Sequence, residues 1–217
     1  MSVRSLRLAV AEDQPLYREM LVSLLGSVPG MAVVASASGA GEAAASFEAR
    51  ALDVALLDVN LGDGDGIALG RRLRAVNPRL GVVLLSATDA MDALLTVPPG
   101  ELRGWSYLSK TSSLSAPALL SALAATAAGR TVLDPALVAR RAPRRDTALD
   151  RLSERQAEVL RLLAEGLSNA GVADRLGLSR RSVDNHVNAI YGALGLRSDG
   201  AHNPRVAAVL RFLEESR

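Results

Sequence analysis

Acidic, hydroxyl and amine side chains follow separate apolar segments in the first half of this 217-residue chain. They are Glu12, Asp13, Asp58, Ser86 and Lys110, and the last is the only lysine of the chain. A carboxylate such as Asp58 can act as a nucleophile and take up a phosphoryl group. The ammonium of Lys110 and the hydroxyl of Ser86 could then bind the phosphoryl oxygens. The set therefore predicts phosphoryl transfer to a carboxylate.

This chemistry needs a divalent cation, because clustered carboxylates repel an incoming phosphoryl group. Mg²⁺ suits a site made only of oxygen ligands and keeps several of its waters. Asp13 and Asp58 are the expected ligands. Glu12 would bind directly or through water, and the backbone carbonyl of Asn60 would complete the set. The metal would neutralise charge on the transferred group and position it.

Alternating strands and helices must bring these side chains together. The expected strands are 6–11, 31–37, 54–58, 82–86 and 105–108. The expected helices are 15–25, 40–50, 67–75, 89–96 and 116–128. Nearly continuous apolar strands between helices predict an α/β fold, a five-stranded, doubly wound parallel sheet covered on both faces. In such a sheet, ligands bind at the carboxyl ends of the strands, where the polar residues fall.

The second half of the chain has a different periodicity. Residues 129–150 combine prolines with arginine pairs, which indicates a linker, although residues 135–141 could form a short helix. From Leu152 onward the pattern is helical only, with helices expected at 153–164, 168–176, 179–194 and 204–215. The expected domains are therefore residues 1–128, a linker at 129–150, and a small all-α domain at 151–217.

Composition excludes several classes of protein. The chain has no cysteine, so disulfides and cysteine metal sites are excluded, and 49% of its residues are hydrophobic, which argues against disorder. No signal-peptide core or long apolar run occurs, so we expect a cytoplasmic protein without membrane contact. Residues 1–128 carry 10 basic and 12 acidic side chains, whereas residues 129–217 carry 15 and 11. A basic second half suits a nucleic-acid partner.

The first half resembles the receiver domain of two-component response regulators, which has a flavodoxin-like fold. Glu12-Asp13 is similar to the acidic pair of that family, and the segment from Asp58 to Leu61 to its phosphorylation loop. Tyr107-Leu-Ser-Lys110 is similar to the segment that carries an aromatic switch residue and the lysine. The resemblance implies phosphorylation of Asp58, and a switch in which Ser86 moves toward the phosphoryl group while Tyr107 changes rotamer.

The chain also departs from the receiver pattern. Gly62 stands where the family usually has proline, and Ser106 replaces the usual glycine before Tyr107. The stretch from Ser86 to Lys110 contains Pro98-Pro99 and is slightly long. These changes affect the expected geometry of the helix at 89–96 more than the chemistry at Asp58.

The second half resembles the LuxR/NarL-type DNA-binding domain. The resemblance lies in Leu152-Ser-x-Arg-x-x-Glu-Val-Leu, Gly166-Leu-Ser-Asn, Val172-Ala-x-x-Leu and Ser179-x-x-Ser-Val-x-x-His. It implies a helix-turn-helix over about Asn169 to Asn188, with the helix from Ser179 in the major groove. The tail, with Asn188-Ala-Ile-Tyr and Leu194-Gly-Leu, is similar to an actinobacterial branch of this family.

The candidate DNA contacts all lie on that helix. Arg180 and Arg181 are placed for phosphates, and Asn185 and Asn188 share a face from which asparagine can read adenine. The remaining candidates are Ser182, Asp184 and His186. Asp184 replaces the usual lysine, and it could accept from cytosine or simply pair with Arg180 at i,i+4.

Together the two resemblances imply a NarL/FixJ-type response regulator. A histidine kinase would phosphorylate Asp58, and the phosphorylated protein would bind DNA as a homodimer. One alternative is an orphan DNA-binding regulator that works without phosphorylation and whose acidic pocket is structural or binds only metal. Another is an enzyme of the phosphatase or hydrolase kind, but the substrate cap and second catalytic acid that it needs are not visible. We therefore expect a regulator and not an enzyme.

Overall fold

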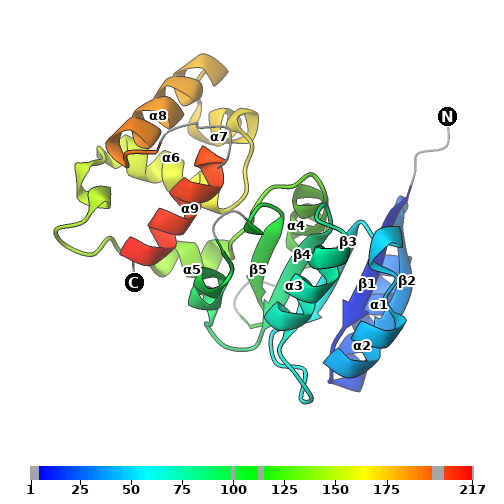
Figure 1. Cartoon of the computed structure of the whole chain (residues 1–217). Coiled ribbons are helices and arrows are strands. Elements are labelled where there is room, and N and C mark those ends of the chain that lie inside the picture. Colours follow the sequence, from blue (N-terminus) through cyan, green and yellow to red (C-terminus); the bar gives the residue numbers. More distant parts are fainter. Residues whose placement is uncertain (1–4, 99–100, 112–114, 197–202, 217) are drawn as a thin grey trace. The chain divides into compact units, whose positions relative to one another are not determined.

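The computed structural model describes residues 5–98, 101–111, 115–196 and 203–216 (Figure 1). The N-terminal residues 1–4, which bear on the expected lack of a leader, lie outside these ranges. The chain divides into two compact units, residues 1–89 with 104–130, and residues 90–103 with 131–217. Segment 90–103 thus packs with the second unit, whereas the sequence assigns it to the first domain. Where independently folding domains begin and end stays a prediction.

The first unit contains the expected five-stranded parallel sheet, with strand order β2-β1-β3-β4-β5. The strands are β1 (Leu6–Ala11), β2 (Met31–Ala37), β3 (Val54–Asp58), β4 (Gly81–Ser86) and β5 (Trp105–Ser109). Every residue of β3, β4 and β5 is buried, which fits their continuous apolar sequences. The doubly wound fold that the sequence predicts is confirmed.

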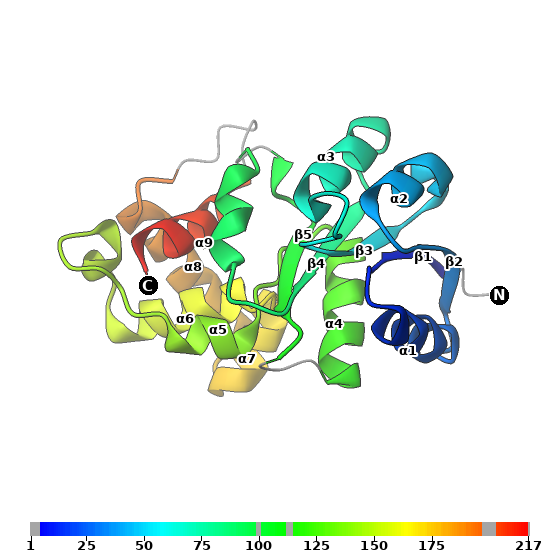
Figure 2. The same ribbon diagram turned by 90° about the horizontal axis from the view of Figure 1, so that it is seen from below.

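Helices cover both faces of this sheet (Figure 2). Helices α1 (Pro15–Gly26) and α4 (Ala116–Ala127) lie on one face, and α2 (Ala40–Ser46) and α3 (Gly66–Val76) lie on the other. A short 3₁₀ helix, η1 (Ala49–Ala51), follows α2. The expected helix over 40–50 is therefore wrong in length. The helix ends because Phe47 adopts an extended backbone and buries its ring.

The short helix expected at 89–96 is present, but it begins at Met91 and is a 3₁₀ helix. Residues Met91–Thr96 form a 3₁₀ helix, η2, which packs against α9 (Pro204–Glu215) in the second unit. Met91 and Leu94 are both fully buried, and residues three apart stack on one face of a 3₁₀ helix. The Thr96 hydroxyl donates to the Ala93 carbonyl and closes the last turn.

The second unit is helical apart from isolated bridges. Its remaining elements are α5 (Pro135–Arg140), η4 (Ala148–Arg151), α6 (Glu154–Ala164), α7 (Asn169–Leu176) and α8 (Arg180–Ala193). Within the expected linker at 129–150, α5 is the short helix that the sequence allows at 135–141. Arg141, 9% exposed, donates to the carbonyls of Leu213 and Ser216 and to Asp92 Oδ1 at 2.6 Å. It joins η2 to the end of α9.

Serine caps define the helix-turn-helix as the sequence predicts. Ser153 and Gln156 form a reciprocal capping box at α6. Ser168 caps α7 by accepting from the Gly171 amide, and Ser179 caps α8 by accepting from the Ser182 amide. Gly177, between α7 and α8, has a left-handed backbone with φ of 63°. Across the described ranges, no helix is both long and apolar enough to cross a membrane.

Candidate functional site

The polar residues that end the strands converge on one cluster. Lys110 Nζ lies 2.7 Å from Asp58 Oδ2 and 2.9 Å from Glu12 Oε1. Carboxylate oxygens of Glu12, Asp13 and Asp58 all lie within 4.8 Å of one another, and we call these three residues the acidic cluster. Parallel strands place their carboxyl ends at one edge, so side chains 98 positions apart meet there.

Glu12 and Asp58 of the acidic cluster are shielded from water, whereas Asp13 is not buried. Glu12 is fully buried and Asp58 is 5% exposed. Burial raises the pKa of Glu12 and the charge of Asp58 adds to the rise, whereas the hydrogen bond from Lys110 opposes it. One buried ammonium thus balances two buried carboxylates. This arrangement leaves excess negative charge that a divalent cation would offset.

The loop after β3 is held by its own acidic side chains. The Asn60 amide donates to Asp58 Oδ1 at 3.2 Å, and Asn60 forms an isolated bridge with Asp65. Asp63 accepts from the amides of Ala40 and Gly41 at 2.6 and 2.9 Å, which ties the loop to the start of α2. These two bonds lower the pKa of Asp63.

A glycine permits the loop to fold back on Asp58. A Cβ atom at Gly66 would lie 2.0 Å from the Asp58 carbonyl oxygen, which no side chain tolerates. Gly62, which replaces the usual proline, has a positive φ of 64° that proline could not adopt. The departure at Gly62 therefore reflects a different turn beside the same aspartate.

Ser86 and Tyr107 are joined through a residue that sequence reasoning missed. The Tyr107 hydroxyl donates to the Thr88 carbonyl at 2.7 Å, and the Tyr107 side chain is fully buried. The Thr88 amide donates to Ser86 Oγ at 3.2 Å. The position of Thr88, two residues after the end of β4, is the sequence feature that could have indicated this contact. The three residues form a connected path from the end of β4 to β5.

Tyr17 is a second neighbour of the site that sequence reasoning missed. Lys110 Nζ lies 4.8 Å from the centroid of its ring, which is within cation–π range. Its hydroxyl is buried without a hydrogen-bond partner, and burial, together with the charges of Glu12 and Asp58, raises its pKa to about 12. Its position four residues after Asp13, in the first turn of α1, could have indicated this contact.

A local contact explains why Ser106 stands where the receiver family usually has glycine. The hydroxyls of Ser106 and Thr126 are 2.6 Å apart and buried, and Thr126 also donates to the Ala122 carbonyl at 2.7 Å. The serine therefore bonds β5 to α4. Ser106 lies within β5, away from its carboxyl end, and does not contribute to the acidic cluster.

Helix α8 presents most of the candidate DNA-contact residues to solvent. Arg180, Arg181, Asn185 and Asn188 are exposed, and Ser182 and His186 are half-buried. Val183, Val187 and Ile190 are buried, as the sequence predicts for the core face. Residues 181, 185 and 188 recur at helical spacing, so one face of α8 is free to enter a groove.

Asp184 is engaged inside the helical unit. Its carboxylate accepts a hydrogen bond from Asn169 Nδ2 at 2.7 Å, and Arg205 Nη1 donates to Asn169 Oδ1 at 3.1 Å. Arg205 also donates to the carbonyl of Leu167. We call Asp184, Asn169 and Arg205 the interhelix network, because it connects α8, α7 and α9. No ion pair between Asp184 and Arg180 occurs within the described residues.

Comparison with known proteins places both halves of the chain. Residues 8–123 match the response regulator receiver domain, and residues 150–202 match the luxR family of bacterial regulatory proteins. The chain is 35% identical to the DNA-binding transcriptional activator DevR/DosR of Mycobacterium tuberculosis, over 86% of this chain and 87% of that protein. It is 30% identical to the nitrate/nitrite response regulator NarP of Escherichia coli, over 95% and 94%.

Solved structures show the same folds. The signal receiver domain of the response regulator NarL from Mycobacterium tuberculosis is 28% identical, with a TM-score of 0.50, over 58% of this chain and 99% of that domain. RcsB, in a structure of two dimers bound to two parallel DNAs, is 20% identical with a TM-score of 0.53, over 97% of this chain and 98% of that one. The second similarity concerns fold alone.

Proposed function

Because this chain belongs to the NarL/FixJ family of two-component response regulators with a LuxR-type DNA-binding domain, we propose that Asp58 accepts the phosphoryl group that controls it. The carboxylate of Asp58 would attack phosphorus, the phosphoryl bond to a histidine of a kinase would break, and an aspartyl phosphate would form. The observation that carries this assignment is the contact of Lys110 Nζ with Asp58 Oδ2.

The acidic cluster fits Mg²⁺. Its donors are carboxylate oxygens that lie within 4.8 Å of one another, and Mg²⁺ prefers such hard ligands. Asp13 and Asp58 would hold the ion, with Glu12 binding directly or through water and the Asn60 carbonyl beside them. When bound, the ion supplies charge neutralisation for the phosphoryl group.

Lys110 and Ser86 would bind the phosphoryl group, and Tyr107 would transmit the resulting change. The Lys110 ammonium would exchange a carboxylate oxygen for a phosphoryl oxygen, and Ser86 would donate its hydroxyl to another. Because the Thr88 amide now binds Ser86 Oγ, that movement would pull on the Thr88 backbone. Tyr107 holds the carbonyl of the same residue, so the pull would reach β5.

Phosphorylation of the full chain tests this assignment. We expect acetyl phosphate with Mg²⁺ to add the mass of one phosphoryl group to the wild-type protein and none to Asp58→Asn. Asp89→Asn is the matched control, because Asp89 is an exposed aspartate near the end of β4, outside the acidic cluster. An adduct that persists in Asp58→Asn, or no adduct on the wild type, would contradict the proposal.

A regulator that works without phosphorylation remains the second reading. It would bind DNA equally well as the wild type and as Asp58→Asn, with or without the phosphodonor. Reaction with beryllofluoride and Mg²⁺, followed by measurement of DNA affinity, separates the two readings. A change in affinity that requires Asp58 supports control by phosphorylation.

The exposed face of α8 would bind the major groove of DNA. Arg180 and Arg181 would contact phosphates, where the amides at the start of the helix add attraction. Asn185 and Asn188 would contact base edges, while Ser182 and His186 would lie against the sugar–phosphate backbone of the DNA. Asp184 would act by positioning, because its carboxylate already binds Asn169.

Two substitutions separate phosphate contacts from base readers. Arg180→Ala should weaken binding on all sequences alike and reduce the salt slope by about 1. Asn185→Ala should change the preference among sites, at about 1–3 kcal/mol for a lost bidentate contact. A selection assay in which Asn185→Ala keeps the wild-type preference would exclude it as a reader.

The remaining assignments follow from family membership. The family consists of transcriptional regulators. We propose a histidine kinase as the phosphodonor, a homodimer as the active form, a cytoplasmic location and membership of an actinobacterial branch of the family, the last supported by the 35% identity to a mycobacterial protein. We also propose a receiver at residues 1–128, a linker at 129–150 and a DNA-binding domain at 151–217.

A further inference from the structure

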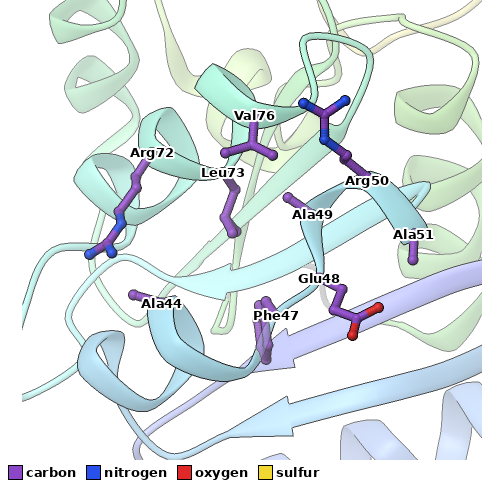
Figure 3. A pocket seen from close by; sticks show the side chains of 9 residues that line it. All are labelled: Ala44, Phe47, Glu48, Ala49, Arg50, Ala51, Arg72, Leu73 and Val76. Atoms are coloured by element: carbon purple, nitrogen blue, oxygen red, sulfur yellow. The ribbon is translucent and has the colours of Figure 1, made fainter.

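A pocket in the first unit lies away from the acidic cluster. It occupies about 590 Å³ and is lined by α2, η1 and the last turns of α3 (Figure 3). Small-molecule sites in proteins span roughly 300–1,000 Å³, so its size suits a ligand. Because α2 ends at Ser46, the last turns of α3 face Phe47, Glu48 and η1 across the pocket instead of a continuation of α2.

The frame of the pocket is held from both sides. Asn77 Nδ2, just after α3, donates to the carbonyls of Ala49 and Leu52 at 2.9 and 3.2 Å. On the other side, Arg7 Nε donates to the Ala51 carbonyl at 2.6 Å. These bonds fix η1 against both α3 and β1. The pocket is therefore preformed, and a ligand would lose little free energy in ordering it.

The floor of the pocket is apolar. The Phe47 ring and the Leu73 side chain lie within it, and Val76 stands at its edge with 47% of its surface exposed (Figure 3). Val76 is one of the few large apolar side chains that the described residues leave exposed. Covering this surface with an apolar ligand group would release water from it.

Two arginines flank this floor. Arg50 extends from η1 on one side and Arg72 from α3 on the other (Figure 3). Both are exposed, and neither has an ion pair or side-chain hydrogen bond within the described parts of the chain. Glu48 is the one acidic side chain that lines the pocket, so its lining carries a net positive charge. Guanidinium groups bind carboxylates through paired hydrogen bonds.

We propose that this pocket binds a small organic carboxylate with an apolar body of about the size of a bicyclic ring. The body would cover Phe47, Leu73 and Val76, and the carboxylate would reach Arg50 or Arg72. Neither the receiver chemistry nor DNA binding uses these residues. The site would give the chain an input that is separate from phosphorylation of Asp58.

Binding of 2-naphthoate to the full-length protein, followed by amide NMR shifts, tests the proposal. We expect saturable shifts at α2, η1 and the end of α3, with a dissociation constant on the order of 0.1–1 mM. The uncharged analogue 2-naphthamide has the same ring system, so it measures the contribution of charge. We expect it to bind about two- to fivefold more weakly, as a partly exposed ion pair predicts.

Matched variants locate the ligand. Ala44→Leu should abolish the saturable shifts, because Ala44 lines the pocket, whereas Ala45→Leu on the exposed side of α2 should leave them unchanged. Arg50→Ala and Arg72→Ala together should remove the preference for 2-naphthoate over 2-naphthamide, and Arg79→Ala should not. Unfolding by urea checks that each variant is folded.

Three results would overturn the proposal. They are shifts that do not saturate, shifts that survive Ala44→Leu in a folded protein, and equal affinities of the wild type for the acid and the amide. The first two exclude the pocket as a binding site. The third excludes an anionic ligand.

Discussion

Lys110 Nζ lies 2.7 Å from Asp58 Oδ2 and so connects the last residue of β3 with the residue that follows β5, although β4 separates these two strands in the sheet. Both side chains are 7% exposed, and the same ammonium also contacts Glu12. A buried charge that loses its partner is costly. Lys110 therefore contributes to the stability of the site in addition to any contact with a phosphoryl group.

We predict that Lys110→Ala lowers the free energy of unfolding by about 3 kcal/mol, because it leaves the acidic cluster without a counter-charge. Mg²⁺ should recover part of the loss by binding the freed carboxylates. Urea unfolding with and without MgCl₂ measures both effects. A variant that equals the wild type in metal-free buffer would show that the ion pair contributes nothing.

Asp63 should make the first unit sensitive to acid. The bonds from Gly41 and Ala40 lower the pKa of Asp63 in the folded state, so the folded state favours the carboxylate. Its contribution is present above the ordinary aspartate pKa of about 3.9 and is lost as pH falls through the lowered value. Urea unfolding at pH values between about 2.5 and about 6 measures this effect. As the pH falls, the free energy of unfolding should decrease more steeply for the wild type than for Asp63→Asn. Parallel profiles would contradict this.

Asp184→Ala should weaken DNA binding without changing which sequence is preferred. The substitution removes a charge-assisted hydrogen bond between α8 and α7, worth about 1–2 kcal/mol of stability. Asn169→Ala breaks the same bond, so the double variant should lose less than the sum of the two single losses. Thermal unfolding and a sequence-selection assay measure the two effects. A shifted preference in Asp184→Ala would instead make Asp184 a base reader.

Arg141 should stabilise the second unit mainly through backbone carbonyls. Arg141→Ala leaves the carbonyls of Leu213 and Ser216 without their donor, and we expect a loss of about 2–3 kcal/mol. Asp92→Asn should cost less than about 1 kcal/mol, because the Asp92 side chain is 63% exposed. Unfolding curves of the two variants provide the comparison. Equal losses would place the main contribution in the ion pair with η2.

The sequence predicts the sheet and the acidic cluster well. Continuous apolar strands between helices indicate a parallel sheet, and a parallel sheet brings the polar residues at the carboxyl ends of its strands to one edge. The capped helices from Ser153, Ser168 and Ser179 were equally predictable, because each cap is a local signal. The length of α2 and the 3₁₀ type of η2 could not be predicted in this way. Both depend on side chains such as Phe47 and Met91 that are buried by distant parts of the chain.

Contacts between elements account for the other differences. Periodicity placed Asp184 on the surface of its helix, yet its partner Asn169 belongs to another helix. Tyr17 and Thr88 follow the same rule, because their importance comes from Lys110 and Tyr107 rather than from a motif. Residue types and spacing identify the reacting groups, whereas their neighbours depend on tertiary packing.

The single lysine of this chain also makes the site directly observable. Lys110 is held between Glu12 and Asp58, and no other residue of the sequence carries an ε-amino group. Selective isotope labelling with lysine would therefore give one side-chain signal that needs no assignment by mutagenesis. That signal would report, in the intact protein, how the charge beside Asp58 responds to each ion or phosphodonor in turn.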